Sequence, residues 1–147
     1  MATLLLIVRL AGERVALPAA EVESVVEIEA LTPVPRAAAH VAGLAALRSR
    51  VLTVVDCRAS LEIGRHEGEG RDAVVVVADG HPYALLVDGV EDVVEASGEA
   101  RPVRTALKGG WRRVAKGTVE AGGDLLLLLD LAALIAGPSA GAARDAA

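Results

Sequence analysis

The sequence contains no phenylalanine, one tryptophan (Trp111), one tyrosine (Tyr83) and one cysteine (Cys57) among its 147 residues. A single cysteine excludes an internal disulfide and is typical of a reducing compartment. Hydrophobic residues nevertheless make up 53% of the chain, so the core must be built from Val, Leu and Ala. Such a core favours small, tightly packed β units over a deep pocket, because ligand pockets are usually lined by aromatic side chains.

Long apolar runs are also absent. The N-terminal run Leu4 to Val8 is five residues long, whereas a membrane-spanning helix needs about 20, and no basic segment precedes it as in a signal peptide. The net charge of −5 opposes general attraction to nucleic acid. We therefore expect a cytoplasmic protein with no nucleic-acid partner and no segment inserted into a membrane.

The motifs that carry catalysis or bind nucleotides and metals are missing as well. The sequence has no P-loop and no G-x-G-x-x-G, and its three histidines, His40, His66 and His81, lack metal-ligand spacing. Cys57 with His40 or His81 could form a nucleophile–base pair, but no third group supports it. Cys57 follows a predicted buried strand, where a small core residue is typical. We predict a non-enzymatic protein without catalytic residues, metal or cofactor.

What the sequence does contain is a succession of short, apolar, β-branched segments. They predict extended structure at Leu4–Leu10 and at residues 15–17, 25–29, 51–55, 73–78, 83–87, 114–119 and 125–129. Asp56 and Asp130 each end one of these segments, and short helices are predicted after them, at residues 59–63 and at Leu131–Ala136. Residues 41–44 are predicted to form a short turn and residues 101–116 a loop.

Two parts of the chain resemble each other. Residues 14–28 align with 82–96 at a constant offset of 68, and residues 51–61 align with 125–135 at an offset of 74, with Asp56 over Asp130. Seven pairs in the first alignment are identical: Ala16/Ala84, Leu17/Leu85, Val22/Val90, Glu23/Glu91, Val25/Val93, Val26/Val94 and Glu27/Glu95. The repeat predicts a mainly β fold of two similar small units, each a five-stranded barrel, which removes exposed sheet edges.

Both units are too small to fold comfortably alone, so they should share a core and fold together. We therefore expect one domain over residues 1–137, with units at about 11–64 and 79–137 that share strands. Residues 138–147 are small and polar and are predicted to be a disordered tail.

A basic segment, residues 101–116, offers a function of a different class. It contains six cationic residues, one tryptophan and no acidic residue. The cationic residues are Arg101, Arg104, Lys108, Arg112, Arg113 and Lys116. The segment could bind a phosphorylated ligand or nucleic acid. A flexible loop that offsets acidic faces elsewhere explains the same composition, and a single aromatic residue is little for base stacking.

A protein-binding module is the remaining class, and five segments bear on it, in order: L-T-P-V-P at 31–35, V-x-G-L-x-x-L-R-x-R at 41–50, V-V-D at 54–56, L-L-V-D-G-V at 85–90 and L-L-D-L at 128–131. In the order and spacing of these segments the sequence resembles the CheW family, the coupling proteins of bacterial chemotaxis arrays. The resemblance covers residues 4–135. It implies two intertwined five-stranded SH3-like β-barrels with short helices. It also implies a non-enzymatic adaptor that joins the cytoplasmic tip of a methyl-accepting chemoreceptor to the regulatory domain of a CheA-type histidine kinase.

The resemblance also implies where the partners bind. A receptor-binding groove between the barrels would involve Leu6, Val22, Val25 and Val90, with Gly43, Leu44 and Arg48 at its rim. Kinase binding would use a barrel edge near Leu31, Thr32 and Val34.

The chain departs from the family pattern in the segment expected to meet partners. Ala46 stands where the family usually has Asn, Ser49 where it has Gly, and Ser24 where it has Glu. Ser49 replaces a residue that takes positive φ freely, so the corner at residues 46–49 should differ in shape or be strained. A divergent adaptor that binds only one of the two partners is therefore an alternative to the full adaptor.

Overall fold

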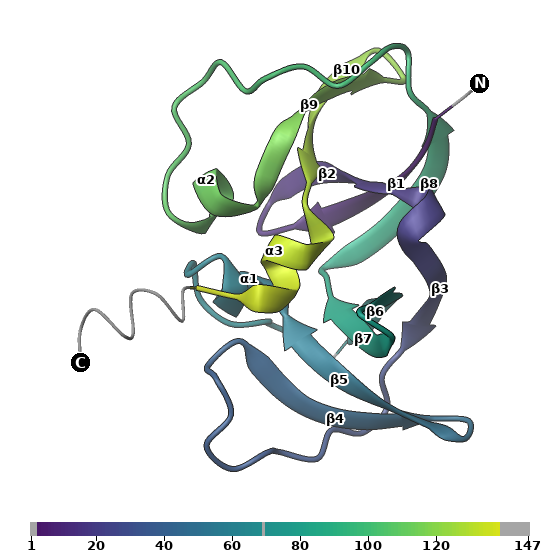
Figure 1. The fold of residues 1–147 in the computed structure, drawn as a ribbon, viewed down its shortest axis with the longest axis vertical. Coiled ribbons are helices and arrows are strands. Elements are labelled where there is room, and N and C mark those ends of the chain that lie inside the picture. The colour runs from purple at the N-terminus through teal and green to yellow at the C-terminus, as the bar shows by residue number, and fades with distance from the viewer. Residues whose placement is uncertain (1–2, 69, 139–147) are drawn as a thin grey trace.

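The strands lie in two five-stranded sheets, which curl around separate interiors and meet along one side (Figure 1). The computed structural model describes residues 3–68 and 70–138. Sheet A has the order β8-β1-β2-β10-β9 and sheet B the order β3-β6-β7-β5-β4. Sheet A comprises β1 (Leu4–Leu10), β2 (Glu13–Pro18), β8 (Gly89–Glu95), β9 (Ala115–Ala121) and β10 (Asp124–Leu129). Sheet B comprises β3 (Val22–Glu27), β4 (Val41–Leu47), β5 (Arg50–Asp56), β6 (Asp72–Ala78) and β7 (His81–Leu86).

An internal two-fold relation connects the sheets. Replacing β1 to β5 by β6 to β10, and the reverse, turns the strand order of sheet A into that of sheet B. The strands β1 and β2 precede β6 and β7 by 68 residues, and β4 and β5 precede β9 and β10 by 74. Both predicted offsets are therefore present in the structure, and each copy begins one strand earlier than the aligned residues indicate. Because each copy contributes strands to both sheets, the copies are intertwined.

The core is aliphatic, as the composition predicts, and has three parts. Alternate residues of one strand serve different parts: Leu5 and Ile7 of β1 face the interior of sheet A, whereas Leu6 and Val8 face the cluster between the sheets. The interior of sheet B is built from Leu52, Val54 and similar residues. We call the cluster between the sheets the central cluster; its buried members come from both copies. The two sheets therefore share one core.

The two aspartates that end β5 and β10 cap the helices that follow. Asp56 Oδ1 accepts hydrogen bonds from the backbone N–H of Arg58 (3.1 Å) and Ala59 (3.3 Å), at the start of α1 (Cys57–Ser60). Asp130 Oδ1 accepts from Ala133 N–H (3.2 Å) at the start of α3 (Leu131–Ala136). This arrangement satisfies N–H groups that a helix start leaves without partners. The bounds predicted for α3 are confirmed, whereas α1 begins two residues before its predicted start.

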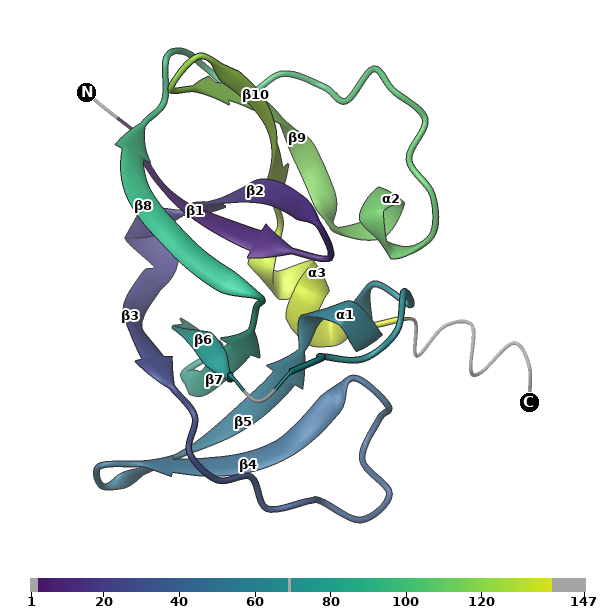
Figure 2. The same cartoon turned by 180° about the vertical axis from the view of Figure 1, so that it is seen from behind.

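Two predictions about the connecting segments are wrong. Residues 41–44 are not a turn but the start of β4, which pairs with β5 on one side and with Thr32 on the other. Residues 101–116 are not only a loop, because α2 (Gly110–Val114) lies within them and packs beside α1 and α3 (Figure 2). A short 3-10 turn, Ala19–Glu21, connects β2 to β3.

Within residues 3–68 and 70–138, no helix is long and apolar enough to cross a membrane. The disorder predicted for the tail concerns residues 139–147, which lie outside the described part of the chain.

Candidate functional site

Three of the predicted receptor-binding residues meet beside the central cluster. Leu6 is a member of that cluster and is 5% exposed, whereas Val22 of β3 and Val90 of β8 are half-buried and pack against it. The strands β3 and β8 are outer strands of sheets B and A, and they follow one another along the same side of the molecule (Figures 1 and 2). Leu6 therefore lies under the surface, and the two valines flank it.

The exposed part of this surface is also two-fold related. Val25 is 47% exposed and Val93, its counterpart at the offset of 68, is 50% exposed. Val93 pairs with Leu6 across β1 and β8, and Val25 pairs with Val74 across β3 and β6. Both side chains thus point to the side of their sheet that faces the central cluster. We call Leu6, Val22, Val25, Val90 and Val93 the aliphatic strip.

Val93 was missed by the sequence reasoning, although the repeat signalled it. Irregularities in pairing occur at matching places of β3 and β8, between Val22 and Ser24 and at the Val90 end of the β1–β8 ladder. Such bulges increase the twist of an outer strand and turn its side chains. They explain how residues three apart, such as Val22 and Val25, both reach the aliphatic strip.

Two of the predicted rim residues, Leu44 and Arg48, line hollows beside the β4–β5 turn. Two hollows of about 480 Å³ flank this turn: the corner hollow, lined by residues 23–26 and 47–50, and the seam hollow, lined by residues 27–30, 32 and 44–48. Arg48 lines both. Val25 shares the corner hollow with it, and Leu44 and Thr32 share the seam hollow. Arg48 thus connects the aliphatic strip to the edge of sheet B.

An ion pair spans the corner hollow. Arg50 pairs with Glu23 of β3 through its guanidinium, whereas Arg48 forms no ion pair with any residue in the described ranges. The position where the family usually has glutamate, Ser24, lies in the same hollow. The exposed cation at the corner is therefore available to an acidic group of a partner.

Gly43 has a structural reason to be glycine. Thr32 and Leu44 exchange both backbone hydrogen bonds (2.9 and 2.8 Å), which brings Thr32 close to β4. A Cβ atom on Gly43 would lie 2.6 Å from the carbonyl oxygen of Thr32, and the φ angle of Gly43 is +149°. The close contact and the positive φ both exclude a residue with a Cβ atom at this position. The matching Gly117 of β9 lies equally close to Arg101, which pairs with Thr118.

The predicted kinase-binding residues lie at this same edge of sheet B. Thr32 forms the bridge to β4, Leu31 packs half-buried against the interior of sheet B, and Val34 is 38% exposed. The seam hollow and the β4–β5 turn lie between these residues and the aliphatic strip. The predicted receptor-binding rim residues Gly43 and Leu44, however, directly adjoin Thr32.

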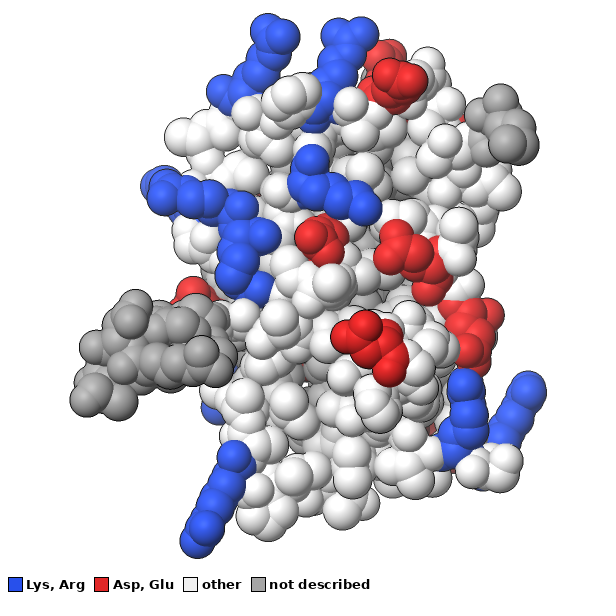
Figure 3. Space-filling model, in the orientation of Figure 1, with Lys and Arg blue, Asp and Glu red and all other residues white. Residues whose placement is uncertain are grey.

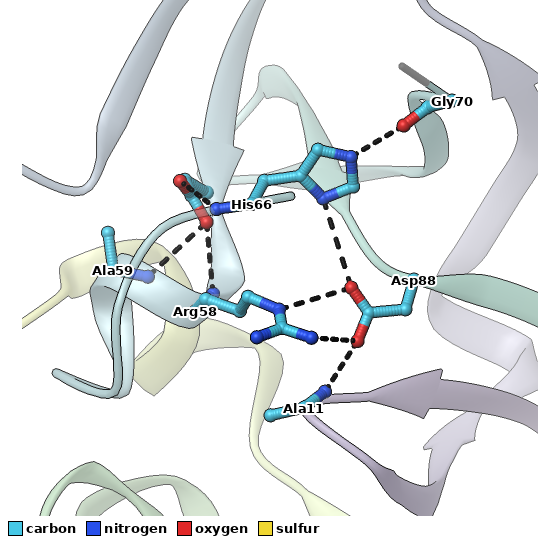
Figure 4. Close-up of polar contacts among 7 residues, drawn as sticks. Ala11, Arg58, Ala59, His66, Gly70 and Asp88 are labelled. Carbon is cyan, nitrogen blue, oxygen red and sulfur yellow. Dashed lines mark hydrogen bonds and ion pairs between the residues drawn. The ribbon is translucent and has the colours of Figure 1, made fainter. Parts of the chain in front are cut away.

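A polar cluster absent from the sequence predictions joins the two sheets (Figure 4). Asp88, between β7 and β8, accepts hydrogen bonds from Ala11 N–H (2.6 Å), Arg58 Nε (3.2 Å) and Arg58 Nη2 (2.9 Å). His66 Nδ1 lies 4.0 Å from the same carboxylate, and its Nε2 lies 2.6 Å from the carbonyl oxygen of Gly70. Ala11 belongs to the β1–β2 turn of sheet A, and Arg58 belongs to α1, which follows β5 of sheet B. The cluster therefore fixes the sheets relative to each other.

The electrostatics of this cluster favour its charged form. Partial burial alone would raise the pKa of the Asp88 carboxyl, but the hydrogen bonds from Arg58 and Ala11 and the charge of Arg58 together lower it. Hydrogen bonding to Asp88 raises the pKa of Arg58. The ion pair is therefore maintained throughout the neutral range.

The candidate nucleophile is a core residue, as predicted. Cys57 is fully buried, and burial raises the pKa of its thiol far above the usual range, so the reactive thiolate is disfavoured. His40 is also buried, and its Nε2 lies 2.8 Å from the carbonyl oxygen of Ile135. In the described part of the chain, no group of His, Cys, Asp and Glu residues could hold a metal ion.

The basic segment divides into one structural arginine and five exposed cations. Arg113 donates from Nη2 to the carbonyl oxygen of Ser60 (2.7 Å) and from Nη1 to that of Ala133, which ties α2 to α1 and α3. Burial lowers the pKa of Arg113, in line with its place between the helices. Lys and Arg side chains gather on the part of the surface around α2 and β9, and acidic side chains on the side of β3 and β8 (Figure 3).

Comparison with known proteins agrees with the fold described above. The family model of the CheW-like domain matches residues 4–138. The chain is 31% identical over 102 residues to the chemotaxis protein CheW of Rhizobium meliloti, with 68% of this chain and 66% of that protein covered. It is 29% identical over 114 residues to the chemotaxis protein CheW of Thermotoga maritima, with 78% and 75% covered. The crystal structure of the scaffolding protein TtCheW from Thermoanaerobacter tengcongensis has the same fold, with a TM-score of 0.78, 20% identity, and 88% and 90% of the chains covered.

Proposed function

Because the chain belongs to the CheW-like domain family, we propose that it is a non-enzymatic chemotaxis adaptor. In this role it joins the cytoplasmic tip of a chemoreceptor to the regulatory domain of a CheA-type histidine kinase. We further propose that it is cytoplasmic, is recruited to receptor clusters and works as one domain. The curated relatives it matches are chemotaxis proteins by name, which supports the pathway.

The observation that carries the proposal is the aliphatic strip. A receptor tip is a helical hairpin, and a groove of small aliphatic side chains accepts the apolar face of a helix. Val25 and Val93 are about half exposed although they lie beside the central cluster, so their apolar area is available to a partner. Arg48 lies at one end of the strip, where it could pair with an acidic residue at the rim of the contact.

The second partner has a separate surface. Leu31, Thr32 and Val34 lie at the edge of sheet B, across the β4–β5 turn from the aliphatic strip. An adaptor needs two surfaces that can be occupied at the same time. The separation of these residues from the aliphatic strip supports binding of receptor and kinase together, with the rim residues Gly43 and Leu44 between the two contacts.

A divergent adaptor that binds one partner is the alternative. Three departures from the family pattern, Ala46, Ser49 and Ser24, line the two hollows at the β4–β5 turn. These three therefore change the region around that turn and not the core. Loss of one partner with retention of the other would be the result.

Titration of the purified protein with each partner separately tests the proposal. We expect comparable binding of a receptor signalling tip and of a kinase regulatory domain, and binding of only one supports the divergent adaptor. Failure to bind either would falsify the adaptor function. Arg48→Glu should weaken receptor binding without unfolding the protein. Arg36→Glu is the matched control, because Arg36 is also exposed and has a positive φ of 64° but lines neither hollow.

One observation favours a function of a different class. Arg101, Arg104, Lys108, Arg112 and Lys116 are exposed, and none forms an ion pair within the described ranges. Such a surface could bind a phosphorylated ligand or nucleic acid. This function predicts binding to a short oligonucleotide that weakens steeply as salt rises, and absence of binding at low salt would eliminate it.

A further inference from the structure

One difference between the two copies lies where each sheet approaches closure. In the second copy, Ala96 bridges Ala121, and Ser97 N–H donates to the carbonyl oxygen of Glu120 (2.7 Å). These bonds join the end of β8 to β9. Sheet A is therefore closed between its two outer strands.

The matching bond is missing from the first copy. The offsets of 68 and 74 make Glu29 and Ala46 the counterparts of Ser97 and Glu120, yet no hydrogen bond joins them within the described residues. On the other side of the strand, the matching bonds are kept. The N–H of Ile28 donates to the carbonyl oxygen of Arg71 (2.9 Å), and the N–H of Ala96 donates to the carbonyl oxygen of Thr3 (2.8 Å). Within the described residues, the bridge between Ala96 and Ala121 has no counterpart between Ile28 and Leu47 either. Sheet B is therefore open here between β3 and β4, although β3 keeps its pairing to β6.

The connections that follow this step differ in length. In the second copy, the chain runs from Ser97 to Arg101 before it pairs with β9 again, whereas in the first copy it runs from Glu29 to Thr32, which is one residue shorter. Leu44, the partner of Thr32, lies two residues from Ala46 on β4, so the shorter connection is still long enough to reach it. The open step beside Ala46 borders the seam hollow.

Ala46 presents unpaired main-chain groups to this hollow. Residues of an antiparallel strand alternate between bonding one neighbour and bonding the other. Leu44 directs its N–H and C=O outward to Thr32, so Ala46, two residues on, also directs its groups outward. No hydrogen bond reaches them from the described part of the chain. The edge is ready to pair with one more extended segment.

The side chains around the seam hollow define what that segment would carry. Ile28 and Ala45, which line the hollow, are 6% and 5% exposed, and the small side chains of Ala45 and Ala46 leave space for an aliphatic residue. Glu27 and Glu29 lie on the wall opposite β4 and favour a basic residue beside it. Thr32 lines the same hollow, which makes the seam continuous with the proposed kinase-binding edge.

We propose that the kinase regulatory domain docks by adding an extended segment to sheet B at this seam, with main-chain hydrogen bonds to Ala46. This inference rests on the proposed adaptor function. The segment has an aliphatic residue that enters the seam hollow and a Lys or Arg that faces Glu27 and Glu29. Such strand addition obtains affinity from the main chain and specificity from alternate side chains.

Ala46→Pro tests the proposal, because proline removes the outward N–H without removing a bond to β5, and proline is tolerated on outer strands. We expect kinase-domain affinity to fall about tenfold, from the lost hydrogen bond and the blocked edge. Receptor-tip affinity should stay unchanged. Glu120→Pro is the matched control, because it places the same substitution at the counterpart position in the closed sheet, and it should bind the kinase domain normally.

The outcomes separate the two proposals. If the wild-type protein does not bind the kinase domain, kinase coupling itself is overturned. If the wild-type protein and Ala46→Pro bind equally well, only docking at the seam is overturned. Amide hydrogen exchange of the wild-type protein provides a second measurement that does not depend on the variant folding. Protection of the Ala46 amide when the kinase domain binds is expected, and an unprotected Ala46 amide would contradict strand addition.

Discussion

Arg48 combines an unusual backbone conformation with an exposed charge. Its φ is +58°, a region that costs residues other than glycine about 1 kcal/mol or more. The sequence predicted strain at Ser49, where the family usually has glycine, but the two-residue turn between Leu47 and Arg50 places the positive φ one residue earlier. Arg36 is also exposed at a positive φ, so the place of Arg48 in both hollows, and not its φ alone, supports the binding role that we propose for it.

Arg48→Gly should stabilise the fold and weaken receptor binding. Glycine accepts positive φ without a steric cost, so the free energy of unfolding should rise by about 1 kcal/mol. Urea unfolding and titration with a receptor tip measure the two effects. Ser49→Gly, a change at the neighbouring turn position without a positive φ, should produce neither effect; lower stability of Arg48→Gly would contradict the assignment of strain.

Asp88 makes stability depend on pH. Its folded-state pKa is lowered, by Arg58 and Ala11 against the effect of partial burial. Its contribution is therefore present above the unfolded-state pKa of about 3.9 and is lost as pH falls through the lower folded-state value. Asp88→Asn should lower the free energy of unfolding by about 1–3 kcal/mol at pH 7, because Arg58 and Ala11 lose a charged hydrogen-bond acceptor.

The difference between Asp88→Asn and the wild-type protein should shrink below about pH 4, as the wild-type carboxyl becomes protonated. Urea unfolding at a series of pH values measures it. Glu95→Gln, which removes an exposed carboxylate of β8, serves as the control and should have little effect. A difference independent of pH would show that Asp88 acts by shape and not by charge.

At the level of elements, the sequence predicts best where pattern and environment agree. Leu4–Leu10 and Leu131–Ala136 were predicted with their observed bounds, because each has a continuous apolar pattern and a clear end. The strand β4 was missed because V-A-G-L-A-A-L has one β-branched residue, and its extended form depends on pairing with β5 and Thr32. Tertiary pairing overrode weak local preference there.

The candidate site divides in the same way. The aliphatic strip follows from the repeat, since Val25 and Val93 occupy matching positions of matching strands. The seam could not be predicted, because residues 29–32 and 97–101 share no sequence pattern that reveals a difference in length. The polar cluster of Asp88 and Arg58 was also inaccessible, because it joins residues 30 apart on different sheets.

Gly43→Ala should disrupt the edge of sheet B. The new methyl group would lie 2.6 Å from the Thr32 carbonyl oxygen, and the φ of the residue would be +149°. We therefore expect the free energy of unfolding to fall by about 2 kcal/mol or more. Thermal or urea unfolding measures it. Gly98→Ala is the control, since a Cβ there meets nothing within 4 Å, and an equal loss in both variants would refute the steric explanation.

At the level of the whole molecule, the central cluster should make the two sheets unfold together. Tyr83 of β7 in sheet B and Trp111 of α2 are the only tyrosine and tryptophan, and both pack against that cluster. Fluorine NMR of fluorotyrosine at position 83 and fluorescence of Trp111 should therefore report the same urea midpoint, as a two-state transition requires.

Leu126→Ala makes this a sharper test. Leu126 belongs to the interior of sheet A and not to the central cluster, and its truncation should cost about 2–5 kcal/mol. Both reporters should shift by the same amount. A shift of the Trp111 signal alone would show that the sheets unfold independently.

The exchange of strand orders between the two sheets has a consequence for chain connectivity. Residues 61–71 connect the end of α1 to the start of β6. By the internal two-fold relation, the end of α3 lies as far from the start of β1 as the end of α1 lies from the start of β6. A linker of the same length could therefore join the end of α3 to the start of β1, since each residue spans up to about 3.3 Å. A circular permutant that begins at Asp72 should then fold with the same pair of sheets.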